Sequence, residues 1–338
     1  MAAATEQRTL RAGVIGLGMM GRHHARVLRE LDGVDLVAVA DPGGDPHSVA
    51  GSLPVLRSVA ELVDAGVDYA VVATPTGLHE QVALELASSG VHTMVEKPVS
   101  ADGPSARRIT DAFQEAGLVG CVGHIERFNP ALQLLRARLE AGELGDVYQI
   151  STRRQGPFPA RIADVGVVKD LATHDIDLTA WVAQSPYTAV SAQVTHRSGR
   201  EHEDLVAAVG TLVDGTVTSH LVNWLTPFKE RVTVVTGDRG CFVADTLTAD
   251  LTFYANATVP TEWAPVSAFR GVSEGDMTRY AFAKREPLRL EHEALRDAVL
   301  GDPSRIVTMA EGLRTVEVAE ALLTSAHEGT SVTLPPVA

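Results

Sequence analysis

The sequence has little cysteine, few aromatic residues and an excess of acidic side chains. Its 338 residues include two cysteines, Cys121 and Cys241, which are far apart in the chain. Two distant cysteines form neither a disulfide framework nor a zinc-binding pattern, so we expect a protein of a reducing compartment, the cytoplasm. The formal net charge of −14 repels phosphate backbones and anionic lipids, which argues against nucleic acid or a membrane as a partner.

The sequence also has no apolar run that reaches the ~18 residues of a transmembrane helix. The first residues, MAAATEQRT, lack a basic flank followed by an apolar stretch, so we expect no secretory signal. Hydrophobic residues nevertheless make up 45% of the sequence. A chain of this length and composition can fill the hydrophobic cores of two domains.

The first 124 residues alternate short apolar runs with helical patterns. The expected helices include Arg22–Leu31 and Glu80–Ser89, which are rich in Ala, Leu, Glu and Arg. The expected strands are Leu10–Ile15, Val34–Ala40, Tyr69–Ala73, His92–Val95 and Val119–Val122. Such alternation is typical of parallel βαβ units, so residues 1–124 are predicted to form an α/β Rossmann domain with a doubly wound parallel sheet.

The pattern changes after Gly123, and residues 125–338 are predicted to form a second, α+β domain. A strand is expected at Val147–Arg153, and short β-type runs over residues 188–253 are joined by turns at Asp214-Gly215 and Asp238–Gly240. The expected helices are Pro130–Ala141, Asp170–Val182, Glu291–Leu300 and Met309–Ser325. The short runs predict an antiparallel meander, and hence an open, mainly antiparallel sheet.

A glycine-rich turn follows the first expected strand. The sequence VIGLGMMG places Gly16, Gly18 and Gly21 in the G-x-G-x-x-G spacing. The first glycine permits a tight turn, the second lets the backbone approach a pyrophosphate, and the third lets the helix pack close to the sheet. Met19 and Met20 lie where the helix opens and its unpaired N–H groups favour phosphate oxygens. The motif therefore predicts a dinucleotide-binding site.

Asp41 ends the second expected strand, about 20 residues beyond the glycines. An acidic residue at this place binds the ribose hydroxyls of the adenosine and repels the additional phosphate of NADP. Because Pro42 follows, Asp41 is also suited to an Asp-Pro turn, and the two roles are compatible. The position predicts NAD as the cofactor in preference to NADP.

Two further groups of residues can carry acid–base chemistry. Glu96, Lys97 and Pro98 follow a predicted parallel strand, at the carboxyl edge where open α/β sheets bind ligands. A lysine there can hydrogen-bond a substrate hydroxyl and stabilise a developing alkoxide. Asp170 and His174 share one helix face, so the imidazole can accept an alcohol proton and the carboxylate can orient it. Either pattern alone would also fit an ion pair on the surface.

The motifs, taken in order, resemble those of the Gfo/Idh/MocA family, named for glucose-fructose oxidoreductase, inositol dehydrogenase and a rhizopine-catabolism protein. The resemblance extends over nearly all of the chain. The segments that carry it are GLGMMG (Gly16–Gly21), ATPTGLH (Ala73–His79), EKP (Glu96–Pro98) and DLATHDID (Asp170–Asp177). It implies an oxidoreductase with a Rossmann domain and a separate substrate domain.

In that family the lysine of EKP and the Asp and His of D-x-x-x-H form the catalytic group, which implies Lys97, Asp170 and His174 here. The residues implied to line the cofactor are Thr74, Pro75, His79, Lys97 and, near the nicotinamide ribose, Glu96. Lys169 departs from the family pattern, in which small or apolar residues are commoner beside the aspartate. Lys169 either faces solvent or adds positive charge near the site.

Three longer segments resemble sugar-nucleotide enzymes of the family, among them UDP-N-acetylglucosamine 3-dehydrogenases. The segments are VGHIERFNPA (Val122–Ala131), GPFPARIADVGVVKDLATHDID (Gly156–Asp177) and NWLTPFK (Asn223–Lys229). The cations available to a diphosphate are Arg127, Arg154, Arg161 and Lys229. Trp224 is suited to stacking on a sugar or base, and His124 is a further candidate for substrate contact. Arg127 and Arg161 would equally fit interdomain ion pairs, and Trp224 would equally fill a sheet face.

These observations lead to one hypothesis and three alternatives. The chain is interpreted as an NAD-dependent dehydrogenase acting on a secondary ring alcohol of a sugar or sugar nucleotide, in the narrowest form carbon 3 of a UDP-sugar. His174 would take the proton, Lys97 hold the oxygen and Asp170 orient the group, although the sequence leaves open which of His174 and Asp170 is the base. The alternatives are an inositol-type cyclitol dehydrogenase, an NADP-linked ketosugar reductase of a biosynthetic pathway, and a cofactor-sensing regulator without catalysis. The retention of all three residues argues against the regulator.

The sheet predicted over residues 188–253 needs cover on one face, and the expected helices are too few to supply it. The apolar residues that a partner subunit would bury are Val206, Val209, Val222 and Leu225. The second domain is therefore also expected to form the interface of a homodimer or homotetramer. No metal site is predicted, because His174, Asp175 and Asp177 have no second ligand pair at zinc spacing.

Overall fold

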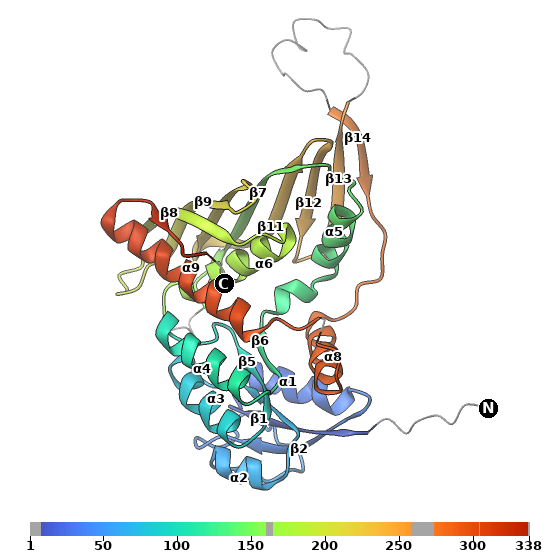
Figure 1. Ribbon diagram of the computed structural model, residues 1–338, viewed down its shortest axis with the longest axis vertical. Helices are drawn as coiled ribbons and strands as arrows, with labels where there is room; N and C mark the ends of the chain where they lie inside the picture. The colour runs from blue at the N-terminus through green and yellow to red at the C-terminus, as the bar shows by residue number, and fades with distance from the viewer. Residues whose placement is uncertain (1–7, 160–164, 258–273, 304, 337–338) are drawn as a thin grey trace, which may run out of the picture. The chain divides into compact units, whose positions relative to one another are not determined.

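The computed structural model describes residues 8–159, 165–257, 274–303 and 305–336 (Figure 1). The chain forms two compact units. The first comprises Met1–Ile125 with Glu286–Glu317, and the second comprises Glu126–Arg285 with Val318–Ala338. The sequence predicted a single boundary at residue 124 and did not anticipate that a late segment returns to the first unit.

A parallel sheet of six strands forms the centre of the described part of the first unit, in the order β3-β2-β1-β4-β5-β6. The strands are β1 (Leu10–Ile15), β2 (Val34–Ala40), β3 (Val55–Leu56), β4 (Tyr69–Val72), β5 (His92–Glu96) and β6 (Gly120–Gly123). All five strands expected from the sequence are confirmed, β1 and β2 at their predicted bounds. The strand order reverses between β1 and β4, and ligands of open α/β sheets bind at the carboxyl ends of the strands on either side of such a point.

Helices cover both faces of this sheet, with α1 and α8 on one face and α3 and α4 on the other (Figure 1). The helices are α1 (Met19–Glu30), α2 (Val59–Asp64), the 3-10 helix η1 (Thr76–Leu78), α3 (His79–Ser88), α4 (Gly103–Glu115), α8 (Pro287–Val299) and the first half of α9 (Met309–Glu328). Leu295 of α8 is buried in the same hydrophobic cluster as Leu28 of α1. This shared core explains why the late helix α8 belongs to the first unit.

The described residues of the second unit form a sheet of nine strands in the order β14-β13-β12-β11-β7-β10-β9-β8-β15. The strands are β7 (Val147–Pro157), β8 (Tyr187–Thr195), β9 (Leu205–Leu212), β10 (Val217–Asn223), β11 (Leu225–Gly237), β12 (Gly240–Asp245), β13 (Asp250–Asn256), β14 (Glu274–Arg279) and β15 (Val332–Thr333). Neighbours are antiparallel except β7 and β10, which are parallel. The predicted mainly antiparallel sheet is therefore confirmed.

The predicted meander, however, is interrupted, because β7 lies between β10 and β11. The hairpins at Asp214-Gly215 and Asp238–Gly240 form as expected. Between β10 and β11 only Trp224 intervenes, and the Asn223 side chain accepts hydrogen bonds from the backbone N–H of Leu225 (2.9 Å) and of Thr226 (3.2 Å). The shortest common hairpin loops have two residues, so the single residue between β10 and β11 does not join them as a hairpin. Instead β11 pairs with the edge of β7 opposite β10.

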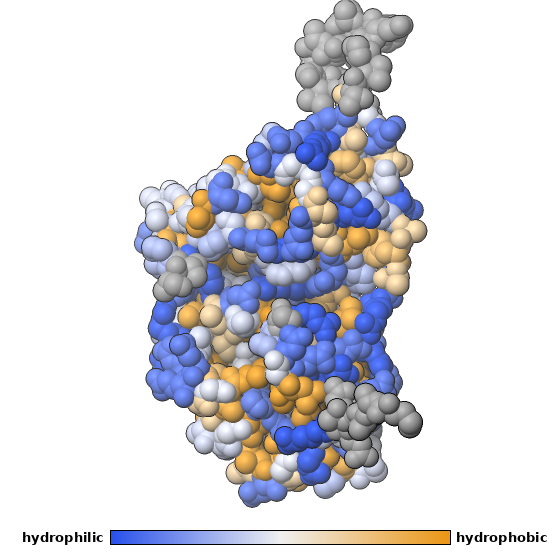
Figure 2. All heavy atoms as spheres, turned by 45° about the vertical axis from the view of Figure 1, so that its right-hand side comes forward, coloured by the Kyte–Doolittle hydropathy of each residue, from blue (hydrophilic) through white to orange (hydrophobic). Residues whose placement is uncertain are grey.

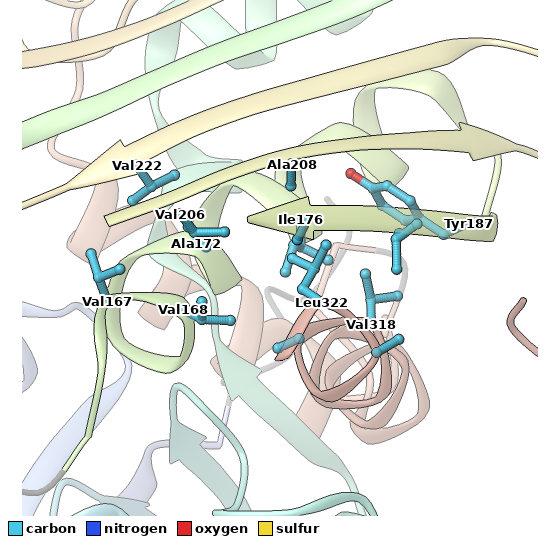
Figure 3. Packing of buried hydrophobic residues seen from close by; sticks show 14 of the residues in the cluster. Val167, Val168, Ala172, Ile176, Tyr187, Val206, Ala208, Val222, Val318 and Leu322 are labelled. Carbon is cyan, nitrogen blue, oxygen red and sulfur yellow. The ribbon is translucent and has the colours of Figure 1, made fainter. Parts of the chain in front are cut away.

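Helices pack on one face of this second sheet (Figure 1). The chain enters the unit through the 3-10 helix η2 (Ile125–Phe128), and the helices are α5 (Pro130–Glu140), the π-helical η3 (Val168–Ala172), α6 (Thr173–Ala183) and the second half of α9. One hydrophobic cluster joins η3, α6 and α9 to β8, β9 and β10 (Figure 3), and another joins α5 and α6 to β7, β11, β12 and β13. Within the described ranges, no helix is long and apolar enough to cross a membrane.

Two of the four residues predicted for a subunit interface lie in this core instead. Val206 and Val222 are fully buried, and their side chains lie between the sheet and the helices (Figure 3). The prediction was wrong for them because side chains alternate between the two faces of a strand, and their neighbours take the outer face. The outer face keeps Val209 exposed, and Leu225 at the start of β11 is also exposed. Figure 2 shows hydrophobic residues interspersed with hydrophilic ones over one side of the molecule.

His220 of β10 makes the stability of the second unit depend on pH. Its ring is buried between the hydroxyls of Thr152 and Tyr187, each 2.8 Å from a ring nitrogen, and burial lowers its pKa to about 4. In the unfolded chain a histidine has a pKa of about 6.5. Below pH 6.5 the unfolded state therefore binds a proton that the folded state refuses, and stability falls with pH until about pH 4.

We expect the free energy of unfolding to decrease by about 2 kcal/mol between pH 7.5 and pH 5 on account of His220 alone. Urea unfolding at the two pH values measures this change. The variant His220→Gln should lose about 2 kcal/mol less over the same interval, because its side chain does not titrate. Equal losses in the variant and the parent would contradict this assignment.

Candidate active site

The glycine-rich turn joins β1 to α1 with the geometry of a dinucleotide-binding turn. Gly16 has a φ of +91°, and a Cβ atom there would lie 2.6 Å from the backbone of Ala73, so only glycine fits. A Cβ on Gly21 would lie 1.8 Å from the carbonyl oxygen of Gly16, so the third glycine lets α1 rest on the turn. A Cβ on Gly18, in contrast, would meet no atom of the described chain within 4 Å. Gly18 therefore faces open space beside the turn.

The N-terminus of α1 fits the pyrophosphate of a dinucleotide. Gly18 is its N-cap, no side chain caps the helix, and its first turn has no acidic residue. Met19 is exposed and Met20 half-buried at this end. The N–H groups of the first helical turn and the positive end of the helix dipole would hold the phosphate oxygens of NAD.

Asp41 lies directly after β2 and its carboxylate is fixed against the glycine turn. Oδ2 accepts a hydrogen bond from the backbone N–H of Leu17 (2.8 Å), and Oδ1 accepts one from that of Gly43 (2.7 Å). The side chain remains half-exposed, and each oxygen keeps a further lone pair for a ribose hydroxyl. Asp41 is thus the turn former that the sequence indicated, and its contact with the ribose stays a prediction.

The loop after β4 carries Thr74 and Pro75 at the same carboxyl edge of the sheet. His79, at the start of α3, is buried behind this loop, and burial lowers its pKa. Its Nε2 lies 2.9 Å from the carbonyl oxygen of Thr74, and its Nδ1 lies 2.9 Å from that of Pro98. His79 therefore ties the loop after β4 to the loop after β5, which shapes the cofactor side of the sheet from within.

Glu96 ends β5, and Lys97 follows it at the carboxyl edge. Glu96 is 7% exposed; its Oε1 lies 2.8 Å from Nε2 of His24, and its Oε2 accepts a hydrogen bond from the backbone N–H of Lys97 at 3.0 Å. Burial favours the neutral acid, yet the hydrogen bond from His24 and the positive charge of Lys97 lower the pKa of Glu96. The half-buried Lys97 side chain thus leaves the backbone beside an ionised carboxylate.

Asp170 and His174 lie in the second unit, whereas Lys97 lies in the first. The sequence predicted a regular helix around them, but Asp170 is in the π-helical turn η3 and His174 is the second residue of α6. Asp170 is 7% exposed and His174 is half-buried. Single π turns within α-helices are frequent at functional sites, because they shift the side chains that follow.

The start of this π turn is held by Glu203, from the loop between β8 and β9. Its Oε1 accepts a hydrogen bond from the backbone N–H of Val168 at 2.9 Å, and its backbone carbonyl accepts one from Val167 at 3.0 Å. Gly166 makes room for this carboxylate, since a Cβ there would lie 2.0 Å from it. The segment that carries Asp170 is therefore anchored at its N-terminal end.

The structure gives two of the predicted substrate cations internal partners. Arg127 is buried and donates two parallel hydrogen bonds to Asp177, from Nε at 2.8 Å and from a terminal nitrogen at 2.7 Å. Arg154 is buried and donates to Asp175 at 3.0 Å and to Glu126 at 2.9 Å. Burial opposes the charge of Arg154, but Asp175 and Glu126 outweigh it and raise its pKa. These arginines join η2, β7 and α6 within the unit, and their contact with a diphosphate stays a prediction.

The other substrate candidates are placed as follows. Trp224 is buried and packs edge-to-face on Phe158 with ring centres 5.3 Å apart, so it fills the core and offers no open stacking face. His124 is buried directly after β6, and Lys229 is exposed on β11. Arg161 lies outside the described residues. No cluster of three or more His, Cys, Asp or Glu side chains in the described ranges is arranged to hold a metal ion.

Sequence reasoning missed His24 and His292, which are both fully buried in the first unit. His292 stands in the apolar stripe of α8, four residues after Leu288 and three before Leu295. A histidine at a position of a helix where buried leucines recur indicates that its ring is buried and has a hydrogen-bond partner. The partner, His24, is contributed by α1 and was not identifiable from spacing.

Two family models match the chain. Residues 10–124 match an oxidoreductase family with an NAD-binding Rossmann fold (GFO_IDH_MocA). Residues 132–243 match the GFO/IDH/MocA C-terminal domain. The two matches follow the order of the two units and include every described residue of the predicted catalytic group.

Two curated relatives are similar to part of the chain. UDP-N-acetylglucosamine 3-dehydrogenase from Acidithiobacillus ferrooxidans is 36% identical over 211 residues, which cover 62% of this chain and 65% of that protein. The scyllo-inositol 2-dehydrogenase (NAD(+)) from Bacillus subtilis is 31% identical over 195 residues, which cover 55% of this chain and 57% of that protein. The matched segments span less than two thirds of either relative.

Solved structures are similar over nearly the whole chain. That of the Acidithiobacillus ferrooxidans enzyme has a TM-score of 0.80 at 28% identity and covers 94% of this chain and 98% of its own. The structure of GenD2 from gentamicin A biosynthesis, solved in complex with NAD, has a TM-score of 0.80 at 25% identity and covers 97% of each chain. The fold is therefore shared over more than nine tenths of the chain.

Proposed function

The chain belongs to the Gfo/Idh/MocA oxidoreductase family, and from this we propose that it is an NAD-dependent dehydrogenase acting on a secondary ring alcohol of a sugar or sugar nucleotide. The observation that carries the proposal lies within the first unit. The uncapped N-terminus of α1 with the open space at Gly18, and the lysine of the EKP segment, stand at the same carboxyl edge of one parallel sheet. Such an edge holds a dinucleotide and presents a cation to the reacting oxygen.

In the proposed reaction Lys97 donates a hydrogen bond to the substrate oxygen and stabilises its developing negative charge. His174 accepts the hydroxyl proton on a ring nitrogen, because imidazole is the commonest general base near neutral pH. Asp170 orients the imidazole and favours its protonated form. Bound NAD supplies the acceptor for the hydride that leaves the carbinol carbon. In the reverse direction the same groups return the proton and stabilise the ketone oxygen.

Among sugars the proposal favours a sugar nucleotide, and the alternative is a cyclitol. The likeness to UDP-N-acetylglucosamine 3-dehydrogenase supports the first and suggests carbon 3 as the site of oxidation. A cyclitol is the second candidate, because Arg127 and Arg154 are paired with carboxylates inside the unit and a scyllo-inositol dehydrogenase is among the relatives. Cyclitols need no cations for a diphosphate, so these internal pairs leave their binding unaffected.

The test is a panel of UDP-sugars, free sugars and inositols, each incubated with NAD while NADH absorbance is followed. Turnover of one class identifies the substrate. The panel also includes the matching ketoses with NADH, which test the reverse reaction. If a preparation that binds NADH turns over none of these compounds, the proposal is contradicted and a cofactor-sensing regulator is favoured.

We expect NADH to bind at least about tenfold more tightly than NADPH, because the Asp41 carboxylate, which is held at the end of β2, would repel the additional phosphate. A tenfold ratio of dissociation constants corresponds to ~1.4 kcal/mol. This is less than the ~4 kcal/mol by which two like unit charges ~4 Å apart repel each other near a protein surface. Fluorescence titration gives both dissociation constants. Asp41→Ser should narrow the ratio, and Asp35→Ser, an exposed residue of the same strand, should leave it unchanged. NADPH binding as tightly as NADH would refute the assignment.

We also expect a homodimer or homotetramer formed through the outer face of the second sheet. This face has no helix packed on it among the described residues, and its strands expose large hydrophobic residues: Val209, Val217, Leu221, Tyr254 and Met277. Light scattering at micromolar concentration measures the mass. Val209→Asp should shift the mass toward a monomer, whereas Val213→Asp, an exposed valine of the adjoining turn, should not. A monomeric parent would contradict the expectation.

A further inference from the structure

A chain of buried side chains connects three elements of the first unit. His24 of α1 and Glu96 of β5 are joined by the 2.8 Å contact between Nε2 and Oε1, and His24 Nδ1 lies 2.9 Å from Nε2 of His292 on α8. The two rings meet edge to face, with centres 5.0 Å apart at 82°. Both histidines are 0% exposed. A buried polar chain of this kind is costly unless every link is made, so each link constrains the next.

The far end of this chain is the backbone of Lys97. One carboxylate oxygen of Glu96 faces His24, and the other accepts the Lys97 N–H at 3.0 Å. Gly123 lies opposite Glu96 on β6. A Cβ atom at Gly123 would lie 3.2 Å from the carboxyl carbon of Glu96, so the glycine provides the space that the carboxylate occupies. The carboxylate therefore bridges the helix that begins at the glycine turn and the residue that follows β5.

We propose that His24 and His292 are positioning residues for Lys97, which act by holding the Glu96 carboxylate between α1 and the Lys97 backbone. The inference rests on the proposed function only in taking Lys97 as a residue that is catalytic and also lines the cofactor, so that NADH affinity reports its position. His24 carries a proton on Nε2, because a carboxylate can only accept. In a neutral ring Nδ1 is then the acceptor, so His292 carries its proton on Nε2. The hydrogen bonds from His292 to His24 and from His24 to Glu96 therefore fix the orientations of both rings and the position of the carboxylate.

Once His24 is replaced, the hydrogen bond from the Lys97 backbone to Glu96 should depend on pH, because charged groups surround the Glu96 carboxylate. The titratable groups that face Glu96 are Lys97 beside it, His24 on α1 and His79 on α3. Behind His24 stand His292 and its neighbour Glu291 on α8, together with His23 on α1. Without the N–H of His24, burial would drive Glu96 to take up a proton at a higher pH than in the parent. A neutral acid holds the Lys97 amide more weakly and no longer balances the ammonium.

Three substitutions at His24 separate the two links. His24→Gln keeps an amide N–H near the Nε2 position, His24→Asn reaches only the Nδ1 position, and His24→Leu keeps neither. NADH dissociation constants between pH 6 and pH 8.5 are measured for each, with the exposed His47→Gln as the control. We expect NADH to bind about tenfold more weakly to His24→Leu and His24→Asn at pH 6 and less so at pH 8.5, the loss expected for one hydrogen bond to a buried charge. His24→Gln should stay within about threefold of the parent.

Removal of His292 tests the outer link. His292→Leu leaves the bond between His24 and Glu96 in place, so the expected loss of NADH affinity is smaller, about two- to fivefold. His292→Gln, which can still donate to His24, should restore most of it. Should His24→Leu yield no folded protein, His24→Asn carries the comparison, because it retains a polar side chain.

The protonation state is read directly from ¹⁵N-histidine spectra of the parent, assigned by the resonances lost in His24→Gln and His292→Gln. We expect His24 to carry its proton on Nε2 throughout this pH range. A bare Nε2 on His24 would overturn the proposal, as would parental NADH affinity and pH dependence in both His24→Leu and His24→Asn. Neither readout uses the substrate, so a failure of the substrate panel leaves this test intact.

Discussion

Replacing His174 by alanine is expected to lower the turnover number by about 10²- to 10⁴-fold, the range for loss of a general base. The NADH dissociation constant should stay within about twofold of the parent value, because the glycine turn and Asp41, which are proposed to hold the dinucleotide, belong to the other unit. Steady-state kinetics on the substrate identified by the panel and fluorescence titration of NADH give the two quantities. His327→Ala, which removes an exposed histidine from α9 of the same unit, is the matched control and should retain parental turnover.

Two companion variants assign the roles within the group. Lys97→Ala should lower turnover to a similar extent and also raise KM, since its ammonium contacts the hydroxyl in the ground state as well. Asp170→Asn should be milder than His174→Ala if the carboxylate only orients the ring, and as severe if Asp170 is itself the base. The comparison decides between the two assignments that the sequence leaves open.

A structural role for these residues predicts a different result. It would lower the melting temperature while turnover per folded molecule is preserved, because a destabilised protein still works while it is folded. Parental turnover in both His174→Ala and Lys97→Ala would remove the catalytic assignment and leave the family resemblance as a guide to the fold alone.

The first unit could be predicted from the sequence because its signals are local. β1 and β2 have their predicted bounds since short, mostly apolar runs mark strands that are covered on both faces. The G-x-G-x-x-G spacing and the acidic residue at the end of β2 each reflect a backbone requirement within one βαβ unit, and the structure shows both, at Gly16 and Asp41. The helix α4 also has a local signal, an Asp102 side chain that accepts from Ser105 N–H, with Pro104 in the first turn.

The placements that could not be predicted depend on contacts between distant segments. The spacing of α8 identifies its apolar stripe but not the core that receives it, and the stripe joins α1 of the first unit. Likewise, counting cations identified Arg127 and Arg154 as candidates for a diphosphate. Their carboxylate partners Asp175 and Asp177 come from α6, and only the fold brings them together. The i, i+4 spacing of Asp170 and His174 does not distinguish a π turn from an α-helix.

The three glycines of the turn differ in what a methyl group would meet, and this difference predicts opposite behaviour of two alanine variants. In Gly21→Ala the new Cβ would lie 1.8 Å from the carbonyl oxygen of Gly16, well inside contact distance and against backbone. Either α1 lifts off the turn or the turn opens. We expect NADH affinity to fall by about 10²-fold or more, since 10²-fold equals ~2.8 kcal/mol and lies at the upper end of the ~1–3 kcal/mol of a typical overpacking strain, and the melting temperature to fall with it.

In Gly18→Ala the Cβ would meet no described atom within 4 Å, and the φ of −75° is one that alanine adopts. The melting temperature without cofactor should therefore equal that of the parent. NADH affinity should nevertheless fall, because the methyl group would occupy the space through which the pyrophosphate approaches the backbone. Full NADH affinity in Gly18→Ala, together with an unchanged melting temperature, would mean that the dinucleotide does not lie against this turn.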